Sequence, residues 1–316
     1  MKMKYLILIN LLCLSTFGIV ACTKQTQIST ISSQENDADK IYDDVIKKSS
    51  SKFTSIKDLE AQANKNNAEA LYQLATLYST GNGISENQLK AFQLFKKSAD
   101  LENVDAMEQL GLIFRDGTSA VKINDIESLK WFIKAADKGS MPANHNIGFA
   151  YYHGRGVKQD RKKAYEYFIK SAESGLLQSQ MIVAAQLYRG DGIPKDLKES
   201  FKWSLKAAEQ GDPEMQNYIG LCYENGYGIV DIDPIKAKIW FERAANSGSL
   251  DGQYNIAMKY YLESGTKDNL AKSIKYAEQA AQKNYKPAIE LLINIYSDKS
   301  SLSYSPEKSQ YWKTKL

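Results

Sequence analysis

Small residues recur along the chain at a nearly constant interval, and this interval marks a repeated structural unit. The positions that open the units lie 36 or 37 residues apart, at Ala70, Ala106, Ala143, Ser179, Met215, Gly252 and Ala288. Pairs of small residues recur at the same interval, at Ser98-Ala99, Ala135-Ala136, Ser171-Ala172, Ala207-Ala208, Ala244-Ala245 and Ala280-Ala281. Two independent markers that share one period predict an array of stacked repeats.

Within each unit the hydrophobic pattern predicts two helices joined by a glycine turn. In the third unit, residues 143–153 place Ile147 among the apolar positions of one helical face. A glycine-rich turn follows at 154–157. Asp160 is the expected cap of a second helix over 163–173, because its carboxylate can accept hydrogen bonds from free amides at a helix start.

Three further landmarks recur in most units. Turn glycines stand at Gly81 and Gly83, Gly190 and Gly192, and Gly226 and Gly228. An aromatic residue precedes the small pair at Trp131, Tyr167, Trp203, Trp240 and Tyr276, and a glycine follows the pair at Gly139, Gly175, Gly211 and Gly248. These residues resemble the Sel1-like repeat, a relative of the tetratricopeptide repeat. The turns at 117–120 and 263–265 depart from its pattern.

The resemblance implies an all-α protein, an α/α superhelical solenoid of about six to seven Sel1-like helix-turn-helix repeats. It also implies a right-handed superhelix with a concave groove lined mainly by the first helix of each repeat. One hairpin exposes apolar faces that only stacking can bury, so neighbouring repeats share a continuous core. We expect the solenoid over 68–298, an N-terminal capping helix over 41–67 and a C-terminal capping helix over 299–316.

An apolar segment at the N-terminus predicts export and lipidation. Two lysines precede a run of about 16 residues that is apolar except for Asn10 and Ser15-Thr16, and this run is shorter than the roughly 20 residues that span a membrane. The run ends at Ala21-Cys22, which resembles the bacterial lipobox, so we interpret 1–21 as a cleaved lipoprotein signal peptide and Cys22 as the lipidated residue. The alternatives are an ordinary cleaved signal and an uncleaved anchor.

The segment after the lipobox is polar and predicts a flexible tether over 22–40. Thr23 follows the cysteine where retained inner-membrane lipoproteins usually carry Asp, which implies the outer membrane and its periplasmic face. Of the three cysteines, only Cys222 lies beyond the lipobox, so the sequence predicts no disulfide framework. The predicted protein is therefore an outer-membrane lipoprotein that is stabilised by packing.

Charge changes this picture little. Lys and Arg total 41 and Asp and Glu 37, and residues of the two signs are interleaved along the chain. Nucleic-acid binding needs a basic stripe, which this pattern lacks, so we expect no nucleic-acid partner.

Candidate catalytic and metal-binding groups are few. The Gly-x-Gly turns follow no strand and precede no Gly-Lys-Ser/Thr motif, so we interpret them as structural. His145 and His153 are eight residues apart without an obvious ligand set, and Cys222 has no paired base, which favours a buried thiol. We expect no metal, no cofactor and no enzyme activity. The alternative is a β-lactamase-like enzyme, although such relatives carry a disulfide in each repeat.

One face of the first helices carries many aromatic and few charged residues. The candidates for partner binding are Tyr72, Glu108, Arg115, His145, Phe149, Tyr152, Met181, Tyr188, Glu224, Tyr254 and Tyr261. Tyr and Arg are favoured anchors in protein interfaces, so this stripe predicts a binding surface. The alternative is that these side chains pack between neighbouring repeats.

These observations predict a membrane-anchored scaffold or adaptor whose groove takes a peptide or helix of a protein partner, such as an envelope protein. A narrower hypothesis is an immunity protein that neutralises a toxin delivered into the periplasm by type VI secretion, such as a lipase. Analogy with repeat lipoproteins encoded beside such effectors suggests this second reading.

Overall fold

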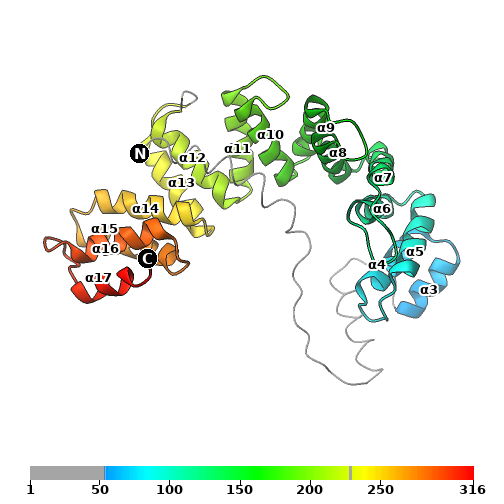
Figure 1. Cartoon of the computed structure of the whole chain (residues 1–316), viewed down its shortest axis with the longest axis horizontal. Helices are drawn as coiled ribbons and strands as arrows, with labels where there is room; N and C mark the ends of the chain where they lie inside the picture. The colour runs from blue at the N-terminus through cyan, green and yellow to red at the C-terminus, as the bar shows by residue number, and fades with distance from the viewer. Residues whose placement is uncertain (1–52, 54, 228–229) are drawn as a thin grey trace. The chain divides into compact units, whose positions relative to one another are not determined.

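The described part of the chain is built from α-helices. In this computed structural model it comprises residues 53, 55–227 and 230–316, which form the fifteen helices α3 to α17 (Figure 1). The prediction of an all-α fold is confirmed. The predicted signal peptide over 1–21, the lipidation site Cys22 and the tether over 22–40 lie outside the described residues.

The helices alternate between the two members of each hairpin, which we name A helices and B helices. The A helices are α4 (Ala68–Thr80), α6 (Val104–Asp116), α8 (Met141–His153), α10 (Leu177–Arg189), α12 (Pro213–Asn225), α14 (Leu250–Leu262) and α16 (Lys286–Ser297). The B helices are α5 (Gln88–Asp100), α7 (Asp125–Asp137), α9 (Arg161–Glu173), α11 (Leu197–Glu209), α13 (Pro234–Asn246), α15 (Lys267–Ala281) and α17 (Pro306–Lys313). Before them, α3 (Ile56–Asn64) lies within the expected N-terminal cap.

Polar side chains set the helix starts. The cap residues are Asn67, Asn103, Ser140, Asp212 and Ser249 for A helices, and Asn87, Asn124, Asp160, Asp196, Asp233, Thr266 and Ser305 for B helices. The carboxylate of Asp160 accepts a hydrogen bond of 2.9 Å from the amide of Lys163, as predicted. A helix starts directly after its cap, so α9 begins at Arg161 rather than at the expected 163. Each such cap contributes about 1 kcal/mol.

Glycine lets the two helices of a repeat approach each other. A methyl group built on Gly111 would lie 2.5 Å from the ring of Phe132 on the following B helix. The corresponding distance is 2.7 Å from Gly148 to Phe168 and 2.6 Å from Gly220 to Phe241. Carbon atoms pack at roughly 3.5–4.0 Å, so these positions of the A helices require glycine.

The glycine turn of the third repeat also packs against the preceding repeat. Gly156 has a φ of +71°, and a Cβ there would lie 2.3 Å from the backbone carbonyl oxygen of Asp125, at the start of α7. Only glycine combines this backbone conformation with so close a contact. In the second repeat, where the second turn glycine is missing, the hydroxyl of Thr118 accepts hydrogen bonds from the amides of Ala120 and Val121.

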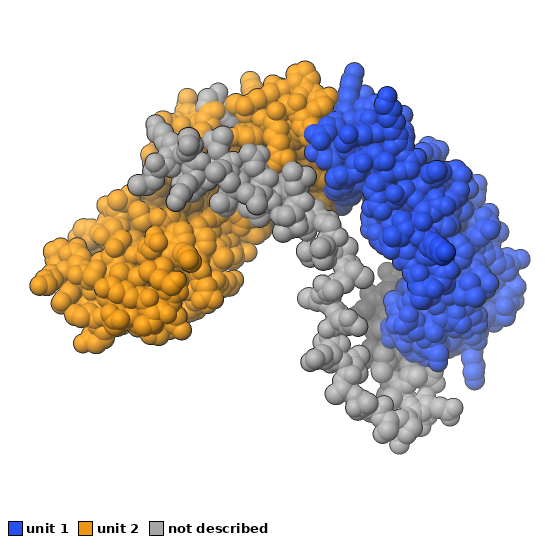
Figure 2. All heavy atoms as spheres, viewed as in Figure 1, with its two compact units in different colours: residues 1–176 blue, residues 177–316 orange. Residues whose placement is uncertain are grey.

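The hairpins stack in series within two compact units, residues 1–176 and 177–316 (Figure 2). Within each unit, consecutive helices pack against one another, so every hairpin contacts the next. A core of alanines, larger aliphatic side chains and aromatic rings lies between them, including Phe95, Phe132 and Ile147 in the first unit and Phe241 and Ile256 in the second. This stacking confirms the predicted repeat solenoid.

The last two helices form a seventh hairpin. We expected a capping helix over 299–316, and α17 covers residues 306–313 of that range. It packs against α16 and buries Trp312 in the core of the second unit. The amide of Ser305, its cap, donates a hydrogen bond of 2.9 Å to the carbonyl oxygen of Tyr296, which closes the hairpin.

Candidate functional site

The eleven candidate residues occupy equivalent positions of the A helices. Counted from the first residue of its A helix, each candidate is the fifth, ninth or twelfth residue. In α8 these positions are His145, Phe149 and Tyr152. Spacings of four and three residues place them on one helical face. Each of the eleven side chains is half-buried, so each contributes to packing and still presents part of its surface to solvent. We name this face the A-helix stripe.

An aromatic cluster forms the centre of the stripe in the first unit. The ring of Phe149 lies 4.9 Å from His145, edge to face, and 5.8 Å from His153, stacked at an interplanar angle of 3°. On the B-helix side, Phe168 meets Phe149 at 5.3 Å. Burial, with the nearby charge of Arg115, lowers the pKa of His145 to about 4, so this imidazole is neutral at neutral pH. The cluster therefore presents rings rather than a cation.

Arg115 is held rigidly beside this cluster. Its guanidinium donates two hydrogen bonds, of 2.8 and 2.7 Å, to the carboxylate of Asp116. A third hydrogen bond, of 2.8 Å, runs to the side-chain oxygen of Asn146 on the next A helix. Fixed in this way, the side chain loses little conformational entropy on meeting a partner.

Two other candidates of the first unit take part in packing, Tyr72 within its own repeat and Glu108 toward the next A helix. The ring of Tyr72 lies 5.8 Å from Phe95 on the following B helix. The hydroxyl of Ser140, the cap of the next A helix, donates a hydrogen bond to the carboxylate of Glu108. Burial raises the pKa of Glu108, and Ser140 opposes this rise. The packing alternative therefore accounts for a share of what these two side chains do.

In the second unit the stripe combines tyrosines with an ion pair. Glu224 and Lys259 pair across consecutive A helices. The ring of Tyr254 lies 6.1 Å from Tyr285, and Tyr254 and Tyr261 also pack against the core of this unit. The remaining candidates here are Met181 and Tyr188, and the ammonium group of Lys195 lies 5.3 Å from the centre of the Tyr188 ring. This part of the stripe is apolar with balanced charges.

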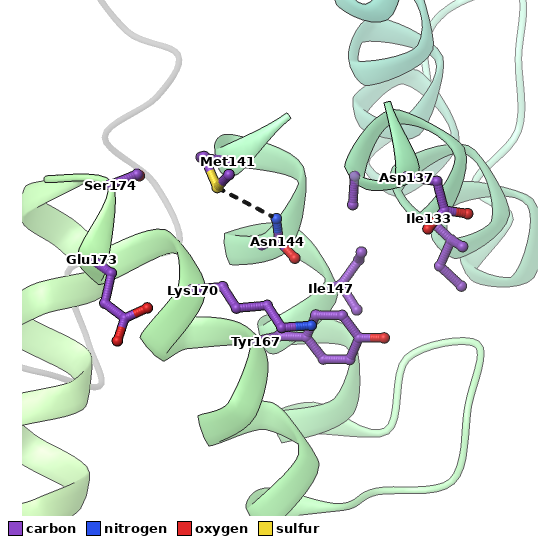
Figure 3. Close-up of a pocket in the computed structure, with 10 residues that line it drawn as sticks. Ile133, Asp137, Met141, Asn144, Ile147, Tyr167, Lys170, Glu173 and Ser174 are labelled. Carbon is purple, nitrogen blue, oxygen red and sulfur yellow. Dashed lines mark hydrogen bonds between the residues drawn. The ribbon is translucent and has the colours of Figure 1, made fainter. Parts of the chain in front are cut away.

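A cleft of about 470 Å³ lies between α7, α8 and α9, and sequence reasoning missed it (Figure 3). Its lining is Ile133, Ala136, Asp137, Met141, Asn144, Ile147, Tyr167, Lys170, Glu173 and Ser174. The side-chain amide of Asn144 lies 3.9 Å from the sulfur of Met141, and Lys170 lies over the ring of Tyr167 (Figure 3). One signal was available in the sequence, because Tyr167 stands where three other repeats carry the larger Trp.

The remaining chemically reactive groups are dispersed. Among the described residues, no three His, Cys, Asp or Glu side chains come together as a metal site, and no helix is long and apolar enough to cross a membrane. Cys222 is buried in α12, and burial raises the pKa of its thiol to about 12. The pKa of the neighbouring Tyr218 is also raised, mainly by burial and to a smaller extent by the nearby Cys222. This environment keeps the thiol protonated and unreactive.

Comparison with known protein families identifies the repeat. Six consecutive segments match the Sel1 repeat, at residues 68–103, 104–140, 142–176, 178–212, 213–249 and 250–285. The matched segments contain helices α4 to α15, so the α16–α17 hairpin follows the last of them.

Among curated proteins, chitin synthase regulatory factor 2 of Schizosaccharomyces pombe is 25% identical over 236 residues, which are 72% of this chain and 40% of that protein. This chain spans less than half the length of the curated relatives it matches.

Two solved bacterial structures have a similar fold. One is c5321, a protective antigen of uropathogenic Escherichia coli strains with an SLR fold, at a TM-score of 0.69 and 25% identity, covering 83% of this chain and 56% of that one. The other is a Sel1 repeat protein from Oxalobacter formigenes, at a TM-score of 0.60 and 28% identity, covering 78% of this chain and 98% of that one.

Proposed function

Because the chain belongs to the Sel1 repeat family, a family of protein-interaction scaffolds, we propose that it binds a protein partner through the A-helix stripe. The observation that carries this proposal is the state of the eleven stripe side chains, each of which is half-buried. Half-buried aromatic rings and a fixed arginine lose little entropy on binding, which is the character of interface anchors. The partner would be a peptide or a helix laid along the A helices.

Substituting three stripe tyrosines tests the proposal. We expect Tyr152→Ala, Tyr188→Ala and Tyr254→Ala, combined in the full chain, to abolish partner capture in a crosslinked pull-down from the cell envelope. Truncation of a central interface anchor typically costs about 2 kcal/mol or more, so three truncations remove most of the affinity. Because these rings are half-buried, circular dichroism at the assay temperature must show that the variant keeps its helices.

A matched control replaces two exposed tyrosines away from the stripe. Tyr304→Ala and Tyr311→Ala remove rings from the last hairpin, and both residues are exposed. This control should capture the partner as well as the parent chain does. Undiminished capture by the stripe variant, or an equal loss in the control, would refute the assignment of the binding surface.

We propose further that lipidation of Cys22 anchors this scaffold to the periplasmic face of the outer membrane. The support is the sequence alone, namely the apolar leader, the Ala21-Cys22 junction and Thr23. Labelling with radioactive palmitate should mark the parent chain and fail to mark Cys22→Ser, and the variant should lose its membrane fractionation. Persistent labelling of Cys22→Ser would contradict the proposal.

The narrower hypotheses stay predictions. The immunity hypothesis predicts a toxin gene beside this one and protection of cells that carry this chain when a neighbouring strain attacks. The β-lactamase-like alternative predicts hydrolysis of nitrocefin by the purified chain, whereas a scaffold predicts none.

A further inference from the structure

The turn between α8 and α9 differs in charge from the turns of the other matched repeats. Residues 153–163 carry five cationic side chains, Arg155, Lys158, Arg161, Lys162 and Lys163, against one carboxylate, Asp160. The equivalent segments of the other five repeats, 80–90, 116–127, 189–199, 225–236 and 262–272, hold at least as many carboxylates as cations. A nearly neutral repeat array therefore concentrates positive charge at one turn, which we name the basic turn and define by its five cationic residues.

The arginines of the basic turn are held in place by neighbouring groups. The Nε of Arg155 donates a hydrogen bond of 3.0 Å to the carboxylate of Asp125, and its Nη2 donates one of 3.0 Å to the backbone carbonyl of Arg115. The guanidinium of Arg161 lies 4.9 Å from the centre of the Tyr152 ring. The contact of Gly156 with the start of α7 fixes the turn backbone. These cations are therefore ordered before any ligand arrives.

The surrounding carboxylates balance only part of this charge. Asp125 pairs with Arg155, and Asp160 is occupied as the cap of α9. The pKa of His153, which adjoins the turn, is lowered by burial and then by the charges of Arg155 and Arg161.

We propose that the basic turn binds an acidic segment of the protein partner. This inference rests on the proposed function, because the turn continues the A-helix stripe through Tyr152 and the stacked Phe149–His153 pair. Planar guanidinium groups bind carboxylates through two parallel hydrogen bonds, and aromatic rings beside them bind the apolar parts of the same segment. A flat lipid surface would need only diffuse positive charge, whereas these arginines are fixed next to rings.

A synthetic peptide provides the probe. Fluorescein-labelled (Glu-Tyr)6 should bind the full chain in fluorescence polarisation, with an affinity that weakens as salt is raised. Peptides (Lys-Tyr)6 and (Ser-Tyr)6 should not bind. We expect Lys158→Glu combined with Arg161→Glu to weaken binding of the acidic peptide at least about tenfold, because the substitutions remove two exposed ion pairs and the reversed charges add repulsion.

The neighbouring repeat offers a matched control. Lys198→Glu combined with Lys202→Glu makes the same change of charge near the start of α11, and should bind the peptide as the parent does. If circular dichroism shows that the first variant has lost helicity, Lys158→Gln combined with Lys162→Gln, at two exposed positions, replaces it and should weaken binding several-fold.

Several results would overturn the inference. These are unchanged peptide binding by the basic-turn variant, an equal loss in the control variant, or equal binding of the basic peptide. Binding of phosphatidylglycerol vesicles through the same residues, without binding of the acidic peptide, would assign the turn to lipid instead. In the crosslinked pull-down, capture that is lost in the tyrosine variant but kept in the basic-turn variant leaves the proposed function standing and removes only this inference.

Discussion

Replacing Gly148 by alanine measures how closely the two helices of a repeat are packed. The new methyl group would lie 2.7 Å from Cδ1 and Cε1 of Phe168, where carbon atoms need roughly 3.5–4.0 Å. Phe168 is fully buried, so its ring can move only if its neighbours move as well. Overpacking of this kind costs about 1–3 kcal/mol, whereas alanine is favoured over glycine in a helix by about 1 kcal/mol. We therefore expect a net loss of up to about 2 kcal/mol.

Urea unfolding followed by far-ultraviolet circular dichroism provides the measurement. With a slope of about 2–3 kcal/mol per molar urea, a loss of 1 kcal/mol lowers the midpoint by about 0.3–0.5 M. A repeat array can unfold in more than one step, so midpoints are compared between variants of the same chain.

The fourth repeat offers the converse substitution as a control. It carries Ala184 at the equivalent A-helix position, and its B helix carries the smaller Ser204 where the third repeat has Phe168. There alanine fits, so Ala184→Gly should lower stability by about 1 kcal/mol through helix propensity. If Gly148→Ala instead raised the stability by about 1 kcal/mol, propensity alone would explain the result and the close-packing argument would be wrong.

Three further predictions follow from buried groups. Burial and the charge of Arg115 lower the pKa of His145 to about 4, whereas its value in the unfolded chain is about 6.5. The unfolded chain therefore binds the proton at a higher pH than the folded chain does. As a result, the free energy of unfolding should fall as the pH drops from about 6.5 to about 4. His145→Phe should remove that part of the pH dependence of the urea midpoint, and an imidazole signal that titrates near 6.5 in NMR would contradict the assignment. Burial raises the pKa of the Cys222 thiol to about 12, so in a chain that carries Cys13→Ser and Cys22→Ser this thiol should react with a thiol reagent only after unfolding. Rapid reaction of the native protein would disprove the burial of Cys222. Trp312→Ala should cost about 3 kcal/mol and speed hydrogen exchange chiefly in α16 and α17; equal acceleration in all repeats would show that the last hairpin does not unfold separately.

The sequence predicted the helices and turns because the interactions that define them are local. Asp160 caps α9 through an amide three residues away, and Gly154 ends α8 in a left-handed conformation. Such interactions need no distant partner, so they can be deduced from the residues themselves. Repetition strengthened the prediction, since the same local signals recur at a fixed interval in consecutive units.

The candidate site shows where this local reasoning ends. The stripe position of Tyr152 followed from helical spacing, but its contact with Arg161 depends on how the turn folds back over α8. Arg115 was a candidate anchor from its residue type, yet Asn146 on the next A helix holds it in place. The positive charge of residues 153–163 was visible in the sequence, and only the fold placed it at the end of the stripe.

By itself, therefore, the sequence determined the repeat period, the helical class, the caps and the glycine stops of this protein. Only the tertiary structure decided which side chains of the A-helix stripe are partly buried by packing and partly exposed to solvent. It also decided that Ser140 donates a hydrogen bond to Glu108, and that a cleft opens between α7, α8 and α9. The physical reason is distance along the chain. Caps and stops act within about four residues, whereas these contacts join residues about one repeat apart and depend on how consecutive hairpins pack.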